Sequence, residues 1–200
     1  MSVAAHSALG ASKAKQWLAC PGSVALAARF EPDPPGKAAR EGTAAHAWAE
    51  FCLANGEVDA DGYIDAEYPS AELAALNVPM TREMADAINV YLEFVWSVLQ
   101  ADDELHVERR FSLEFIAPGM FGTNDCAVLK RKARTLHVID YKHGAGVYVD
   151  EKDNVQTQYY ALGALHAFIA EGPFDKIVLT IVQPRAGGEP VRSQIFDAID

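Results

Sequence analysis

Residues 125–142 read DCAVLKRKARTLHVIDYK, and this stretch decides the fold. Two runs rich in apolar and β-branched residues, Asp125–Lys130 and Thr135–Tyr141, flank a polar tip, which predicts a β-hairpin. If the turn is centred just after Lys132, Asp125 falls opposite Asp140. Cross-strand partners have Cβ atoms only ~4.5–5.5 Å apart. The hairpin is therefore expected to bring two carboxylates face to face.

Two carboxylates at that distance repel each other unless a proton or a cation lies between them. Such oxygen ligands, completed by water and a substrate phosphate, suit Mg²⁺ or Mn²⁺. Lys142 lies two residues beyond Asp140 and so projects from the same face of the strand. There its ammonium group, expected to be mostly solvated, could orient a water and stabilise charge on a phosphate. A lone Asp-x-Lys is nevertheless more often a plain surface pair.

The rest of the chain predicts a single domain, residues 1–200, of the α/β class. Residues 1–104 are mainly helical, and residues 105–200 form a mixed central sheet flanked by helices. The segment Asp59–Leu76 is acidic and is predicted to be irregular. Upstream helices are predicted at Ser12–Ala19, Gly22–Phe30, Thr43–Asn55 and Thr81–Gln100. Downstream of residue 104, the predicted elements besides the hairpin are strands at Leu105–Leu113, Lys176–Gln183 and Val191–Phe196 and a helix at Asn154–Ala170.

The net charge of −11 argues against a protein that coats DNA without regard to sequence, because phosphate contacts need Lys and Arg. It does not exclude a nuclease, which needs only a local positive track and a metal. The one dense basic run, Lys130–Arg134, is either a solvated hairpin tip or a phosphate contact. No apolar run approaches the ~18–20 residues of a membrane span, and residues 1–20 lack the pattern of a secretory signal. A cytoplasmic location without a membrane partner is expected.

Further motifs accompany the hairpin. In chain order they are Gly42-Thr-Ala-Ala-His46, Gly122-Thr-Asn-Asp125, Val138-Ile-Asp140-Tyr-Lys142 with Gly144, and Gln156-x-x-x-Tyr160. Together they resemble the successive motifs of the RecB-like exonuclease group of the PD-(D/E)xK nuclease superfamily. The stretch Ser12…Trp17-Leu-x-Cys20-Pro21 resembles phage-encoded members in particular. The resemblance covers the chain from Ser12 to about Arg185. It implies a restriction-endonuclease-like core with an N-terminal helical region.

The resemblance also implies roles for single residues. Asp125 and Asp140 would be carboxylate ligands of Mg²⁺ or Mn²⁺, Lys142 the catalytic lysine, and His46 an additional metal ligand. The side chain of Tyr141 is expected on the opposite face of the strand, but its backbone carbonyl is a further candidate ligand.

The same residues also have ordinary structural interpretations. Gln156 and Tyr160 share one helix face; the resemblance assigns them to the DNA backbone, whereas alone they are ordinary helix-surface groups. His46 alone is more often a core histidine, with Glu50 as its hydrogen-bond partner. Glu108 is a weaker candidate for a carboxylate that faces the site, because a solvent-facing glutamate is at least as common on such a strand.

The function implied by the resemblance is that of a metal-dependent deoxyribonuclease. It would be an exonuclease that acts on DNA ends in phage-type recombination or repair, in the host cytoplasm and with a single-strand annealing protein as partner. The motifs are equally compatible with an endonuclease. A catalytically inactive nuclease-like module that binds nucleic acid or protein, and an unrelated acidic α/β interaction domain, are the alternatives. Some relatives hold an iron–sulfur cluster with three C-terminal cysteines; no cysteine follows Cys126, so no cluster is expected.

Overall fold

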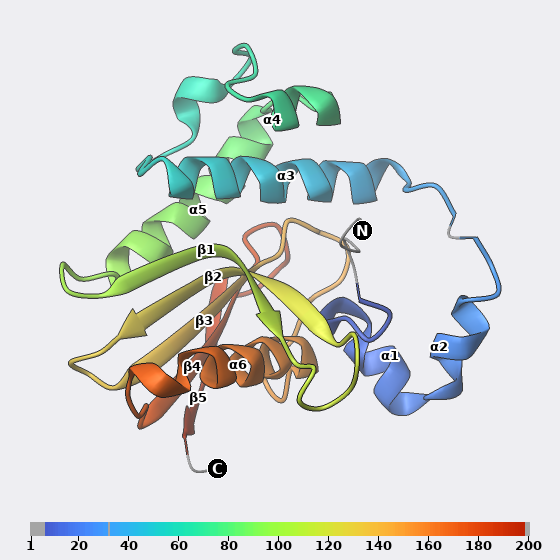
Figure 1. Ribbon diagram of the computed structural model, residues 1–200. Helices are drawn as coiled ribbons and strands as arrows, with labels where there is room; N and C mark the ends of the chain where they lie inside the picture. The colour runs from blue at the N-terminus through green and yellow to red at the C-terminus, as the bar shows by residue number, and fades with distance from the viewer. Residues whose placement is uncertain (1–6, 32, 199–200) are drawn as a thin grey trace.

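The computed structural model describes residues 7–31 and 33–198, and it is an α/β fold built on one mixed sheet (Figure 1). The five strands lie in the order β1-β2-β3-β4-β5, and every neighbouring pair is antiparallel except β3 and β4, which are parallel. The strands are β1 (Glu104–Ser112), β2 (Phe121–Lys130), β3 (Thr135–Tyr141), β4 (Lys176–Val182) and β5 (Val191–Asp197). The expected mixed sheet flanked by helices is thus confirmed.

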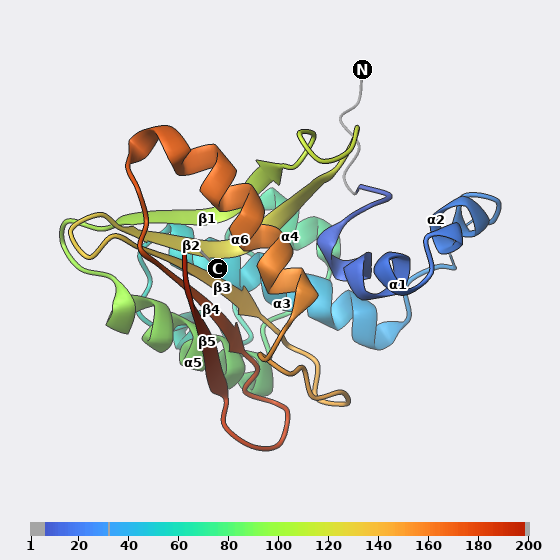
Figure 2. The ribbon, with the colours of Figure 1, turned by 90° about the horizontal axis from the view of Figure 1, so that it is seen from below.

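Helices cover both faces of this sheet. Figures 1 and 2 show α3 and α5 on one face and α6 on the other, with α1 and α2 extending to one side. Each face has its own apolar core, one packed against α3 and α5 and the other against α6. The helices are η1 (Ala11–Lys13), α1 (Ala14–Ala19), α2 (Gly22–Ala27), α3 (Lys37–Ala54), η2 (Asp61–Tyr63), α4 (Ala71–Leu76), α5 (Arg82–Val98), α6 (Val155–Phe168) and η3 (Ile169–Glu171). Over the part of the chain that the structure describes, none of these helices combines the length and the apolar character needed to cross a bilayer.

Two expectations about the helical part were wrong. The helix predicted to begin at Thr43 begins at Lys37, more than one turn earlier. The segment Asp59–Leu76, predicted to be irregular, contains α4. Ser70 caps α4 by accepting a hydrogen bond from the N–H of Leu73, which is the preferred role of serine at a helix N-terminus.

The β2–β3 hairpin has the predicted register. Lys130 pairs with Thr135 and Cys126 with Ile139, as a turn centred after Lys132 requires. The four cations of its basic tip all form ion pairs: Lys130 with Asp103, Arg131 with Glu104 and Glu171, Lys132 with Asp102, and Arg134 with Asp175. These carboxylates offset the local positive charge, which disfavours a phosphate contact at the tip.

A buried histidine joins β3 to β4. His137 is 6% exposed, and its Nε2 lies 2.7 Å from Thr180 Oγ1. Burial, together with the positive charge of Lys130, lowers the pKa of His137 to about 4. Because this pKa is below the ordinary value of 6.5, the native state holds the neutral imidazole, whereas the unfolded chain takes up a proton below about pH 6.5. The contribution of His137 to the free energy of unfolding is therefore fully present above pH ~6.5 and is lost as the pH falls towards 4.

We therefore expect the free energy of unfolding to fall by about 2 kcal/mol between roughly pH 7.5 and pH 5 through this one group. Urea unfolding at the two pH values measures the change. The His137→Gln variant, which keeps a hydrogen-bonding group but cannot titrate, should show a decline smaller by that amount. Parallel declines in the two proteins would contradict the assignment.

Candidate metal centre

A cavity of about 940 Å³ lies where residues of α3, the ends of the central strands and the start of α6 come together. Most residues singled out in the sequence line it: His46, Glu108, Asp125, Asp140, Lys142, Gln156 and Tyr160. Tyr141 is different, because its ring is buried in the core against α3 and α5. Its backbone N–H donates a 2.7 Å hydrogen bond to Asp125 Oδ2. The candidate role of its carbonyl as a metal ligand stays a prediction.

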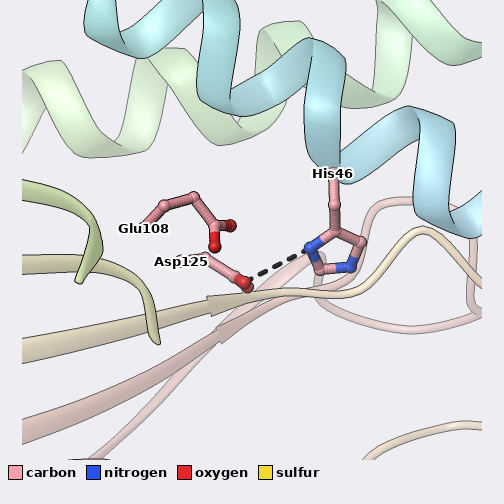
Figure 3. A group of neighbouring side chains, drawn as sticks. All are labelled: His46, Glu108 and Asp125. Atoms are coloured by element: carbon pink, nitrogen blue, oxygen red, sulfur yellow. Dashed lines mark ion pairs between the residues drawn. The ribbon is translucent and has the colours of Figure 1, made fainter. Parts of the chain in front are cut away.

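Asp125 and His46 are in contact at the wall of this cavity. The apolar side chains of α3, among them Ala45 and Trp48, pack into the core, and His46 is left to project towards β2 (Figure 3). His46 Nδ1 lies 3.3 Å from Asp125 Oδ1. The partner of His46 is therefore the strand aspartate and not Glu50, the partner that a simple core histidine was expected to use.

Glu108 completes a triad with these two residues. One ligand atom from each of His46, Glu108 and Asp125 lies within 4.8 Å of the other two, and Figure 3 shows the Glu108 carboxylate directed towards Asp125. Glu108 has φ of 45°, in the middle of β1. A residue other than glycine in this left-handed conformation costs on the order of 1–3 kcal/mol and is concentrated at functional sites. Strain is thus found at the residue that turns a carboxylate towards the cavity.

Asp140 and Lys142 form a second group beside the triad. Lys142 Nζ lies 2.9 Å from Asp140 Oδ2 and donates a hydrogen bond of 3.0 Å to Gln156 Oε1. Gln156 Nε2 in turn donates to the Tyr160 hydroxyl at 3.1 Å. The Lys142 side chain is only 22% exposed, so the expectation that it is mostly solvated was wrong. Gln156 and Tyr160 hold the lysine in place, and their contact with DNA stays a prediction.

The start of α6 and a strand glycine make this arrangement possible. Asn154 caps α6 by accepting hydrogen bonds from the N–H groups of Gln156 and Thr157. A Cβ on Gly122 would come within 3.0 Å of ring atoms of Tyr159 and Tyr160. Glycine at position 122 therefore allows α6 to approach the strand closely enough for Gln156 to reach Lys142.

The charges of the site shift its pKa values in a consistent pattern. Burial alone would raise the pKa of Asp125, but His46 and Lys142 outweigh burial and lower it. Burial would lower the pKa of His46 and of Lys142, and the neighbouring carboxylates raise both. Burial and then Asp125 raise the pKa of Glu108 to about 7. Burial also raises the pKa of Asp140, with Asp125 adding to the effect and Lys142 opposing it.

This donor set fits a divalent cation. Glu108 and Asp125 repel each other, and a cation between them would remove that repulsion. Two carboxylates and one imidazole suit Mn²⁺, and Mg²⁺ is bound through carboxylates with several waters retained. Asp140 lines the same cavity but is not a member of the triad found among the described residues. That Asp125 and Asp140 share one cation stays a prediction.

A second polar network, which the sequence analysis missed, ties α3 to the end of β3. Glu41 Oε1 lies 3.2 Å from His143 Nε2 and accepts a 2.8 Å hydrogen bond from Arg185. Arg185 also donates to Glu83 of α5 at 2.7 Å. Glu41 precedes His46 by five residues on α3, so the network fixes the helix that carries the histidine. Nothing in local sequence pattern marks these residues, because Glu41 lies 102 positions from His143 and 144 positions from Arg185.

A protein-family model matches almost the whole chain. The match runs over residues 6–194 and so includes the triad, the Asp140–Lys142 pair and all five strands, β5 except for its last residues. The model's description names no activity. The chain belongs to the family described as "Protein of unknown function (DUF2800)".

Proposed function

We propose that the chain is a metal-dependent deoxyribonuclease with a PD-(D/E)xK core, and that it acts as an exonuclease on DNA ends. One observation carries the proposal. A triad of His46, Glu108 and Asp125, with ligand atoms within 4.8 Å of one another, shares a single cavity with the Asp140–Lys142 ion pair. Two carboxylates and an imidazole can hold a metal ion that assists phosphodiester hydrolysis, and an ammonium group can stabilise the charge that builds on the phosphate.

A bound Mg²⁺ or Mn²⁺ would supply a Lewis acid for the phosphate and would lower the pKa of a water. The protein residues do the rest. Asp140 and Gln156 hold the ammonium group of Lys142 beside the triad, where it orients the attacking water and offsets charge that builds on the phosphate. The water oxygen bonds to phosphorus, one P–O ester bond breaks, and the products are a phosphate monoester and a hydroxyl. Tyr160 and Gln156 line the approach for the DNA backbone.

The biological setting follows from the motif resemblance alone. It is phage-type recombination or repair in the host cytoplasm, with a single-strand annealing protein that would take up the strand exposed by digestion.

The direct test is incubation with linear and with circular duplex DNA in the presence of Mg²⁺, Mn²⁺ or EDTA. Digestion of the linear form alone, dependent on the metal, is the expected result. Nicking or cutting of the circle would make the enzyme an endonuclease. DNA binding without cleavage would favour the inactive nuclease-like module, and the absence of both would favour an unrelated interaction domain. The Asp125→Asn protein, purified in parallel, controls for contaminating nucleases.

Metal binding by His46 can be tested without any substrate. The His46→Ala variant should bind Mn²⁺ at least ~10-fold more weakly, in the range seen when a metal site loses a supporting group, while it keeps its fold. Isothermal titration calorimetry measures the affinity. The matched control is His166→Ala. His166 is exposed near the C-terminal end of α6 and stacks on Phe115, and it does not line the cavity of the triad. Equal Mn²⁺ affinity in wild type and His46→Ala would return His46 to the role of a core histidine.

A further inference from the structure

The N-terminal part of this acidic protein carries a net positive charge. The first 40 residues hold five Lys or Arg and two Asp or Glu, a net charge of +3. The remaining 160 residues hold 12 and 26 respectively, a net charge of −14. Figure 1 shows that residues 7–31 and 33–36, in blue, form an arm with α1 and α2 that extends beside the sheet before the chain enters α3.

The cations of this N-terminal segment lack carboxylate partners among the described residues. Eight of the 12 Lys and Arg residues after position 40 form ion pairs with carboxylates. The five in the first 40 residues are all exposed, and within the described ranges they have no ion-pair partner. They are Lys13, Lys15, Arg29, Lys37 and Arg40. Charges that the protein does not neutralise itself remain available to an anionic partner.

An apolar groove of about 440 Å³ lies on the same arm. Trp17, Val24 and Ala27 line it together with Phe30, which is 70% exposed. Helix α2 buries none of its residues, and Figures 1 and 2 show it as the element farthest from the sheet. The fold of the arm therefore leaves aromatic and aliphatic surface uncovered next to unpaired cations.

The groove and the cavity of the candidate metal centre share Lys13 in their walls. The neighbouring residues Gly10 to Ser12 line the larger of the two. A chain-like ligand could thus pass from the groove over Lys13 and reach the triad. Glu31 and Asp33 also line the groove. These carboxylates would repel phosphates, so the groove suits bases, and the lysines suit the phosphates.

We propose that the N-terminal arm together with the first turn of α3, residues 7–31 and 33–40, binds an unpaired DNA strand and leads it to the metal centre. Aromatic surfaces beside a positive track are the general chemistry of single-strand binding, because unpaired bases stack on rings while cations follow the backbone. A duplex is a poorer fit, since its bases already stack on one another. The inference rests on the proposed nuclease function, and it adds the form of the substrate and the surface that receives it.

Fluorescence anisotropy with labelled (dT)₂₀ in EDTA tests the inference, because binding is then measured without metal or cleavage. Phe30→Ala should weaken binding about 10-fold, as loss of one stacking platform does. The control is Phe115→Ala, which removes a phenylalanine that is 49% exposed outside the arm. The double variant Lys13→Gln/Lys15→Gln should make the dependence of log K on log salt shallower. The negative slope should lose about 1.4 of its magnitude, or ~0.7 per phosphate contact on a single strand. Lys132→Gln, at the hairpin tip, should leave the slope unchanged.

Wild-type levels of (dT)₂₀ binding and of salt dependence in both arm variants would overturn the inference. If wild type still digests duplex DNA in Mg²⁺, that result leaves the nuclease proposal standing. Tight, arm-dependent binding in a protein that never cleaves DNA would support the arm and count against the nuclease. Binding to duplex but not to (dT)₂₀ would show that the arm receives a different form of DNA and would also overturn the inference.

Discussion

Replacing Lys142 with alanine is expected to slow metal-dependent DNA cleavage by about 10²-fold or more, the usual effect of removing a preorganised charge stabiliser. The ammonium group lies 2.9 Å from Asp140 and 3.0 Å from Gln156, so it is fixed in the cavity before substrate arrives. Initial rates on linear duplex DNA measure the effect. Arginine at position 142 should rescue poorly, because a planar guanidinium cannot occupy the place of a compact ammonium group.

The same substitution should also lower stability, because Lys142 neutralises Asp140, whose side chain is only 2% exposed. Loss of one partner of a buried polar pair costs about 1–3 kcal/mol. The pKa of Asp140 is raised, first of all by burial. Without Lys142 this carboxyl can therefore take up a proton, and the loss of stability should lie towards the lower end of that range. Urea unfolding quantifies the change, and Lys132→Ala is the control, since the Lys132 side chain is 81% exposed. Near wild-type cleavage by folded Lys142→Ala protein would remove the basis of the mechanism.

Asp125→Asn is expected to have the second large effect, the loss of measurable Mn²⁺ binding together with a fall in cleavage of about 10³-fold. Asparagine keeps the size of the side chain and can still accept the hydrogen bond from the N–H of Tyr141. It removes the charge that faces His46 and Glu108, and a neutral amide is a much weaker ligand for a hard cation. The metal-free stability should change by no more than the ~0.5–3 kcal/mol of an ordinary substitution.

Thermal unfolding with and without Mn²⁺ separates the loss of metal binding from a change in the stability of the metal-free protein. A ligand at 100 times its Kd stabilises the native state by about 2.7 kcal/mol, so Mn²⁺ should raise the melting temperature of wild type and not that of Asp125→Asn. Asp102→Asn serves as the control, because Asp102 is exposed and pairs with Lys132 at the hairpin tip. An equal Mn²⁺ shift in all three proteins would place the metal elsewhere.

The hairpin was predictable from sequence because its information is local. A polar tip between two apolar runs defines the turn, and the turn defines every cross-strand pair from Lys130–Thr135 to Cys126–Ile139. Helix α4 was missed although a local signal existed: Ser70 as N-cap, Glu72 in the first turn and helix-forming residues after it. Its six residues are too few to produce a clear amphipathic period.

Other parts of the site could not be predicted because their causes are not local. The alternation of apolar and polar residues along β1 cannot reveal that Glu108 adopts a left-handed backbone conformation. Glu108 was therefore ranked below Asp140 as a metal ligand, although it completes the triad. The motif resemblance grouped Gln156 with Tyr160, but only the packing of α6 against Gly122 shows that Gln156 contacts Lys142. Most of the candidate residues named from the sequence line the cavity, and the tertiary contacts decide which of them touch.

The backbone of Glu108 has a consequence for how this chain tolerates mutation. At φ of 45°, glycine, asparagine or aspartate would fit the backbone with less strain than glutamate. If selection acted on folding alone, Glu108 would therefore be replaced early. A related protein without catalytic activity would be expected to have glycine, asparagine or aspartate at this position. Under the proposed function, the carboxylate is the reason for a glutamate at a position where the backbone alone would favour glycine, asparagine or aspartate.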